Sequence, residues 1–155
     1  MDEANVKLKD IEKKIPGILS GNASIAANYR LIQGITGIGQ VNAATIIVMT
    51  DNFNKFDSPG KFACYRGVAP FEHTSGTSIR GKTRTSKLAA KDLKVLLARA
   101  AITAMVHDPQ IRKYYLRKVA EGKHKASVIN AIRAKIIYRC FAVVKRQTPF
   151  VRLMA

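Results

Sequence analysis

Apolar side chains recur at helical spacing through most of this 155-residue chain. An amphipathic helix carries apolar residues three or four positions apart on the face that it buries. This spacing predicts a mainly α fold, with helices over about 24–33, 40–50, 87–106 and 125–146 and a short one from Pro59 to Tyr65. Strands have little support from the pattern.

The second half carries the clearest helices. The helix over 87–106 has one wide apolar face, formed by Leu93, Leu96, Leu97, Ala100, Ala101, Ala104 and Met105. Asp108-Pro109 then reads as an N-cap followed by proline at the first helical position, which predicts a further helix ending near Gly122. The long helix over 125–146 is expected to bury Ile129, Ile132, Ile136, Cys140 and Val143.

The first residues form a separate arm. Residues 2–15 place Leu8, Ile11 and Ile15 on one narrow stripe, and Pro16-Gly17 is expected to stop the run. Such a coiled-coil-like stripe could pack on the domain or pair with another chain. We therefore divide the chain into an arm over 1–23 and one domain over 24–155, a length typical of a single core.

The charge changes the picture most. The chain has 27 basic and 10 acidic residues, a net charge of +17. Residues 80–155 alone hold 19 basic and 3 acidic side chains. Charge gathered in one half favours a polyanionic partner such as nucleic acid, and helices with solvated lysines are the alternative.

Two cysteines, Cys64 and Cys140, form neither a disulfide framework nor a zinc-binding spacing, so we expect both to be reduced and to pack as small apolar residues. No apolar run approaches a membrane span, and the N-terminus has no signal core. The prediction is a cytoplasmic protein with no membrane partner.

A glycine-rich turn separates the first two helices of the domain. Gly37-Ile38-Gly39 resembles the hairpin of a helix-hairpin-helix, with small residues Ala43 and Ala44 early in the next helix. Gly37 and Gly39 would permit a tight turn and leave the amides of residues 39–41 uncovered, where they could accept a phosphate. A plain helix-to-helix turn is the alternative. The glycine order does not fit a dinucleotide-binding fingerprint.

The segment over 66–87 lacks apolar periodicity, which predicts a loop. Its residue types also make it a candidate for binding or cleaving a phosphodiester. Ser75 is followed by several cations: Arg80, Lys82, Arg84 and Lys87, with Lys91 and Lys94 beyond them. Such a set would bind a phosphodiester and stabilise the charge that develops at phosphorus, and His73 could act as a general base. The same residues could equally be solvent-facing phosphate contacts with no catalysis.

Residues 76–83 also match the letters of a nucleotide-binding loop, G-x-x-x-x-G-K-[ST]. That loop must follow a buried parallel strand and open a helix. The preceding stretch is broken by Pro70 and is polar, so a nucleotide binder is the weakest of the three interpretations.

The order of several blocks is more specific than any one motif. These are Gly37-Ile38-Gly39, Phe56-x-Ser58-x-x-Lys61-Phe62-Ala63-x-Tyr65-x-Gly67-x-Ala69-Pro70, Ser75-Gly76, Ser86-Lys87 and Leu93-x-x-Leu96. Over residues 30–105 the chain resembles the C-terminal transposase domain of the DEDD-type insertion-sequence transposases, the "one-ten" group, which are related to Piv-type DNA invertases.

The resemblance implies DNA transposition with Ser75 as the nucleophile that forms a covalent link to DNA. It implies DNA as a partner, a structured guide RNA, and a homo-oligomer. It also implies an N-terminal RuvC-like nuclease domain whose acidic residues bind Mg²⁺. That domain is absent here, so we expect a fragment that contains no metal site and no cofactor of its own. Alone, the fragment would bind nucleic acid and fail at strand transfer.

Two departures from the family pattern stand out. Leu88-Ala89-Ala90 replaces a Gly-Asn turn, and Lys94 stands where the family carries arginine. Lysine keeps the charge and loses the bidentate fork of a guanidinium. The main rival function is a helix-hairpin-helix module that binds nucleic acid without chemistry.

Overall fold

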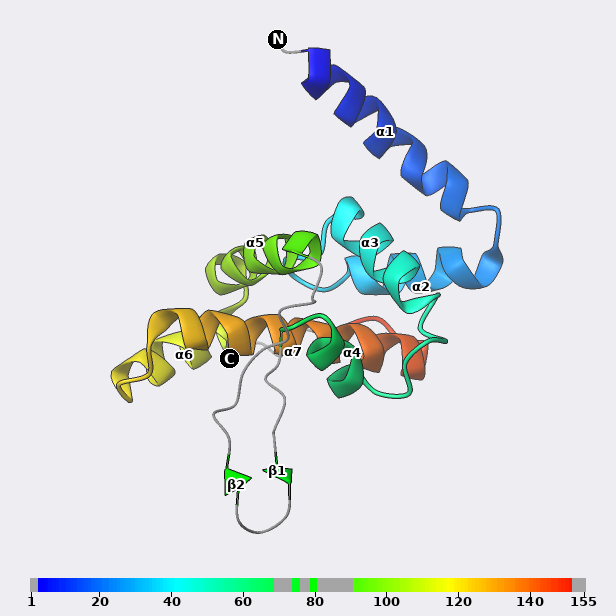
Figure 1. Ribbon diagram of the computed structural model, residues 1–155. Helices are drawn as coiled ribbons and strands as arrows, with labels where there is room; N and C mark the ends of the chain where they lie inside the picture. The colour runs from blue at the N-terminus through cyan, green and yellow to red at the C-terminus, as the bar shows by residue number, and fades with distance from the viewer. Residues whose placement is uncertain (1–2, 69–73, 76–78, 81–90, 152–155) are drawn as a thin grey trace.

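The computed structural model describes residues 3–68, 74–75, 79–80 and 91–151, and the fold is mainly α as predicted. The first helices are α1 (Glu3–Leu19), α2 (Ala23–Gln33), α3 (Gln40–Thr50) and α4 (Pro59–Tyr65). After the strands β1 (Thr74–Ser75) and β2 (Ile79–Arg80) come α5 (Lys91–His107), α6 (Pro109–Ala120) and α7 (Lys125–Arg146). Figure 1 shows α7 crossing the middle of the helical body.

Helix α7 is the element around which the others pack. It contacts α2, α4, α5 and α6. Its buried residues are Val128, Ile132, Ile136, Ile137, Cys140 and Val143. The expected face is therefore confirmed for four of its five residues, whereas Ile129 is only half-buried and Val128 and Ile137 are buried in addition. Burial raises the pKa of the Cys140 thiol to about 12, so this cysteine is a protonated core residue.

Helix α5 supplies the second large part of the core. Leu93, Leu97, Ala100, Ala101 and Ala104 are each no more than 1% exposed. These five belong to the predicted apolar face, and its other two members, Leu96 and Met105, are half-buried. Residues 87–90, with which the predicted helix began, lie outside the described part of the chain.

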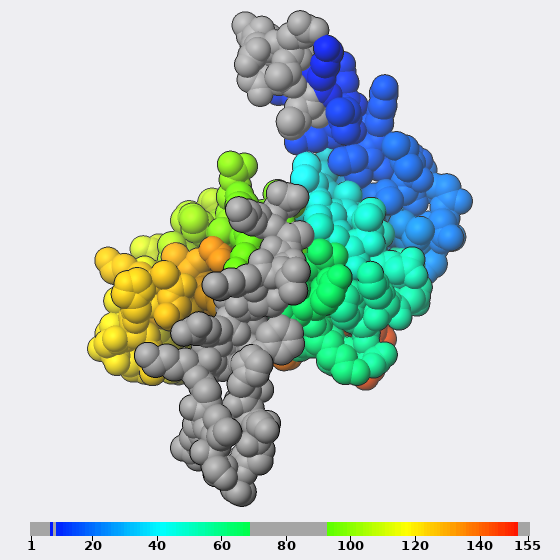
Figure 2. Space-filling model, viewed as in Figure 1, coloured from blue at the N-terminus to red at the C-terminus, as the bar shows by residue number. Residues whose placement is uncertain are grey.

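The predicted stop of the first helix was wrong. Helix α1 continues through Pro16 to Leu19. Proline removes one backbone hydrogen bond, but Ser20 still donates its amide to the Pro16 carbonyl at 3.0 Å. Ile15 and Leu19 pack against the core on either side of the proline, which favours continuing the helix. The earlier part of α1 projects from the body (Figures 1 and 2), and Ile11 is exposed.

A polar network joins three segments that are distant in sequence. The Asn28 side chain of α2 donates to Asn52 Oδ1 at 2.9 Å and accepts from Gln147 Nε2 at 2.9 Å. Asn52 belongs to a turn, Asp51 to Phe53, in which all three residues have positive φ. The turn aims Phe53 at Phe141 of α7, with ring centroids 4.9 Å apart, and so ties the end of α3 to α7.

Asp108 joins α5, α6 and α7 at one point. Its Oδ1 caps α6 by accepting the amides of Gln110 and Ile111 at 3.0 and 3.2 Å. Its Oδ2 accepts from Arg139 of α7 at 2.7 Å. Only 3% of Asp108 is exposed, so this ion pair is shielded from water and salt. The N-cap predicted at Asp108-Pro109 is therefore confirmed, with an ion pair added to it.

Among the described residues, no helix has both the length and the apolar character that crossing a membrane requires.

Substituting Asp108 tests the contribution of this junction. Asp108→Ala removes the cap and leaves Arg139 without its carboxylate, so the free energy of unfolding should fall by about 3–5 kcal/mol in urea denaturation. Asp57→Ala is the matched control, because Asp57 pairs with Lys61 in full exposure and should have no measurable effect. Equal losses in the two variants would contradict the role given to Asp108.

Candidate nucleic-acid interface

The glycine turn between α2 and α3 is built from buried isoleucines and one left-handed glycine. Ile35 and Ile38 are 1% and 5% exposed, and the Ile38 amide donates to the Ile35 carbonyl at 3.0 Å. Gly37 has φ +95°, a conformation that other residues rarely adopt. The expected tight turn therefore forms, with Ile38 in the core and Ala43 fully buried behind it.

Gly37 also fixes the turn against another helix. A Cβ atom added to Gly37 would clash with the backbone carbonyl of Ala100 in α5. Only glycine permits this approach, so two separate constraints act on the same residue. The contact sets the position of the turn relative to α5.

Gly39 has a different role from Gly37. It is the N-cap of α3 with φ −88°, and no side chain caps the helix there. The space around Gly39 is open, since an added Cβ would meet nothing within 4 Å. The start of α3 thus borders a hollow of about 410 Å³ that Gly39 and Asn42 line, and the Asn42 side chain donates to the Gly37 carbonyl at 3.2 Å. Free amides at a helix start attract anions.

Arg99 of α5 lines the same hollow, together with Thr103. Its side chain is exposed and forms no ion pair among the residues that the structure describes. A cation therefore stands beside the uncapped helix start. Sequence reasoning missed Arg99 because its only local signal is one basic residue within a largely apolar helix.

The segment predicted to carry the chemistry is described in part. Ser75 lies in β1, which pairs in antiparallel fashion with β2; Ser75 is opposite Ile79, and Thr74 is opposite Arg80. The sequence pattern predicted no strand here, so this antiparallel pair of two-residue strands corrects the prediction of a loop. The pairing brings the backbones of Ser75 and Arg80 to adjacent positions of one ladder.

The structure describes only some of the other predicted cations. Lys82, Arg84 and Lys87, together with His73, lie outside the described residues. Lys91 is the first residue of α5, with its backbone alone described. Lys94 is half-buried on α5 and lines a second hollow, beside Arg133 of α7.

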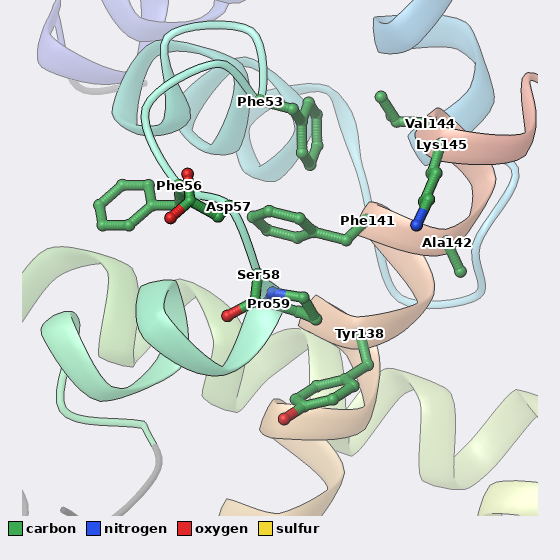
Figure 3. A pocket seen from close by; sticks show the side chains of 10 residues that line it. All are labelled: Phe53, Phe56, Asp57, Ser58, Pro59, Tyr138, Phe141, Ala142, Val144 and Lys145. Atoms are coloured by element: carbon green, nitrogen blue, oxygen red, sulfur yellow. The ribbon is translucent and has the colours of Figure 1, made fainter.

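A third cavity contains none of the predicted site residues. It measures about 590 Å³ and lies between α4, the segment before it, and α7. Figure 3 shows Phe141 between Phe53 and Tyr138, and the Phe53 and Phe141 rings meet edge to face. The lining is mostly apolar, with Asp57 and Lys145 also contributing.

Within the described ranges, no three His, Cys, Asp or Glu side chains lie close enough together to hold a metal ion.

The family described as Transposase IS116/IS110/IS902 matches residues 29–116, which include the turn, the strand pair and α5. The chain belongs to this transposase family. It is 31% identical to the pilin gene-inverting protein of Moraxella lacunata and 30% identical to that of Moraxella bovis, in both cases over 83% of this chain and 41% of the relative. An uncharacterised protein of the insertion element IS110 from Streptomyces coelicolor is 31% identical over 68% of this chain and 26% of that protein.

The family resemblance predicted from the sequence is therefore confirmed. The chain spans less than half the length of the curated relatives that it matches.

The two glycines of the turn should respond differently to alanine. Gly37→Ala should lower the free energy of unfolding by about 2–4 kcal/mol, from the positive φ and the clash with Ala100. Gly39→Ala should cost less than about 1 kcal/mol, because its φ and its surroundings admit a methyl group. Chemical denaturation of both variants measures the difference, and similar losses would contradict the packing described for Gly37.

Proposed function

We propose that this chain is the part of a DNA recombinase that binds DNA and presents Ser75 as the nucleophile for strand cleavage and transfer in transposition. The family supports a role in transposition, and two relatives are named for inverting a pilin gene, which is a rearrangement of DNA. The observation that carries the DNA-binding part is the uncapped start of α3 at Gly39, with Arg99 beside it.

The glycine hairpin would hold one phosphate of the DNA backbone. The amides at the start of α3 would donate to its oxygens, and Arg99 would neutralise its charge. Such a contact recognises the backbone rather than a base, so it positions DNA without selecting a sequence. Gly37 would position this contact because it packs against the backbone of α5. Gly39 has no side chain, so the start of α3 stays accessible to a phosphate.

The proposed chemistry at Ser75 is an exchange of one phosphodiester bond for another. The Ser75 Oγ would attack phosphorus, and a Ser75–phosphate bond would form as the bond from phosphorus to a deoxyribose oxygen breaks. The leaving oxygen takes up a proton, and the serine hydroxyl loses one. A deoxyribose hydroxyl attacking the phosphoserine then releases Ser75 and rejoins the strand. Arg80, with Lys82, Arg84, Lys87 and Lys91, would balance the charge on the phosphate oxygens.

Other parts of the proposal lie outside this chain. A nuclease domain with acidic residues would hold Mg²⁺, and a guide RNA and further copies of the protein would complete the assembly. The rival function is a helix-hairpin-helix module that binds DNA without chemistry. Both functions share the hairpin contact, so formation of a covalent protein–DNA adduct separates them.

Ser75→Ala in the full-length protein should abolish the covalent protein–DNA adduct, because the alanine side chain has no oxygen to bond to phosphorus. DNA affinity should stay within about twofold, since a neutral hydroxyl contributes little to binding dominated by phosphate charge. Denaturing gel electrophoresis of the reaction with labelled DNA reports the adduct. The neighbouring Thr74→Ala is the control and should retain it. An adduct that persists in Ser75→Ala would rule out Ser75 as the nucleophile.

Gly39→Asp tests the hairpin contact separately. Aspartate is a favoured N-cap, so stability should be unchanged or higher, while its carboxylate occupies the phosphate position and repels DNA. We expect about a tenfold loss of DNA affinity in a fluorescence anisotropy titration, the loss of roughly one charge-assisted contact.

Asn22→Asp is the matched control for that experiment. Asn22 caps α2 by accepting the amides of Ser24 and Ile25, so aspartate adds the same charge at an equivalent helix start elsewhere. DNA affinity should change by no more than about twofold in this variant. Equal losses in the two variants would show that added negative charge, and not the hairpin, explains the effect.

A further inference from the structure

The second hollow lies where three parts of the chain meet. It measures about 380 Å³ and is lined by Gly67 after α4, Lys94 of α5, and Ser127, Asn130 and Arg133 of α7. Among the described residues, no carboxylate lines it. The hollow thus gathers two cations and two polar side chains without an acidic group.

No described carboxylate compensates the charge of Arg133. Neither Arg133 nor Lys94 forms an ion pair with any residue that the structure describes. The Nε of Arg133 is buried and has no hydrogen-bond partner among the described residues, and desolvation lowers the pKa of this guanidinium. A partly buried charge with an unpartnered nitrogen is unfavourable, and a bound anion would compensate it.

The remaining groups suit a phosphate. Ser127 stands in the first turn of α7, where its exposed hydroxyl can donate and where the positive end of the helix dipole lies. A lysine, an arginine, a hydroxyl and a helix start together are the donor types that phosphate oxygens accept from. Arg133 adds the planar fork that Lys94 lacks.

The position of the hollow relates it to Ser75. Gly67 lies just before the segment that carries Ser75, and Lys94 lies just after it. The Asn130 side chain donates to the Val68 carbonyl at 2.6 Å, which ties the start of that segment to α7. A group bound in the hollow therefore lies beside Gly67, one residue before Val68, where the described chain ahead of β1 ends.

We propose that this hollow binds one phosphate of the DNA strand on which Ser75 acts, with Arg133 and Lys94 as its cationic contacts. The inference rests on the proposed function and adds a second phosphate contact to the one at Gly39. DNA is favoured as the source of the phosphate because the matched relatives are named for gene inversion and an insertion element.

Arg133→Gln tests the proposal in the 155-residue chain with a labelled DNA duplex. Affinity at low salt should fall about tenfold, the loss of one charge-assisted contact. The slope of log affinity against log salt should become shallower by about 0.9, the loss of one neutralised phosphate. Arg146→Gln is the matched control, because Arg146 is exposed at the far end of α7; its affinity should change by no more than about twofold.

Thermal denaturation reports whether Arg133→Gln is folded. If it is not, two further variants still test the proposal. Lys94→Gln removes the other cation from a different helix and should show a similar loss. Arg133→Lys keeps the charge and should retain the salt slope while losing part of the affinity. Loss in Lys94→Gln with a retained slope in Arg133→Lys supports the site.

The outcomes separate this inference from the proposed function. Unchanged DNA binding by Lys94→Gln, or equal effects of Arg133→Gln and Arg146→Gln, would overturn the proposal that this hollow binds phosphate. The proposed function would still stand. A chain that fails to bind DNA at all overturns the proposed function. Weakened binding of a structured RNA with unchanged binding of DNA overturns the assignment to DNA.

Discussion

The structure depends on one constraint: α7 buries apolar residues along its whole length, against four different helices. Val128 near its start and Val143 near its end are at most 3% exposed, so both ends of this helix are packed against the core. Burying such side chains is worth about 1.5–3 kcal/mol each. Helices α2, α4, α5 and α6 are positioned by this one surface, and the Asp108–Arg139 pair and the Asn28–Gln147 bond fix its orientation.

The same constraint directs most basic residues of these helices toward solvent, whereas Arg133 and Arg139 are half-buried. A helix that buries one face must carry its lysines and arginines on the other, and the 19 basic side chains of residues 80–155 fall largely on α5, α6 and α7. Carboxylates pair with some of them, as Glu121 does with Lys118 at 2.6 Å. With only 3 acidic residues in this half, most cations cannot be paired locally. The amphipathic pattern of α5, α6 and α7 therefore produces both the apolar core and the basic surface.

The sequence predicted the parts of the fold that depend on local pattern. Helices α2, α3, α4, α6 and α7 lie within about one or two residues of their expected bounds, because apolar periodicity and caps such as Asp108 act locally. The predicted stop of the first helix at Pro16 was wrong because contacts of Ile15 and Leu19 with the core outweigh one lost hydrogen bond. The turn of Asp51 to Phe53 carries no glycine, and its positive φ values depend on Asn28 and Phe141, which are distant in sequence. Arg99 and Arg133 were missed for the same reason: only packing shows which cations line a hollow.

Helix α5 connects the two hollows by carrying a cation of each. It carries Arg99 in the first hollow and Lys94 in the second, an axial offset of about 7.5 Å at 1.5 Å per residue. The contact of Gly37 with Ala100 fixes the hairpin on α5, and the packing of α5 on α7 fixes Arg133 relative to both. The two hollows are therefore linked through the packing of α5. The segment that carries Ser75 follows Val68 and precedes Lys91 in the sequence. Under the proposed function, this helical frame would hold the DNA strand relative to the strand pair that carries Ser75.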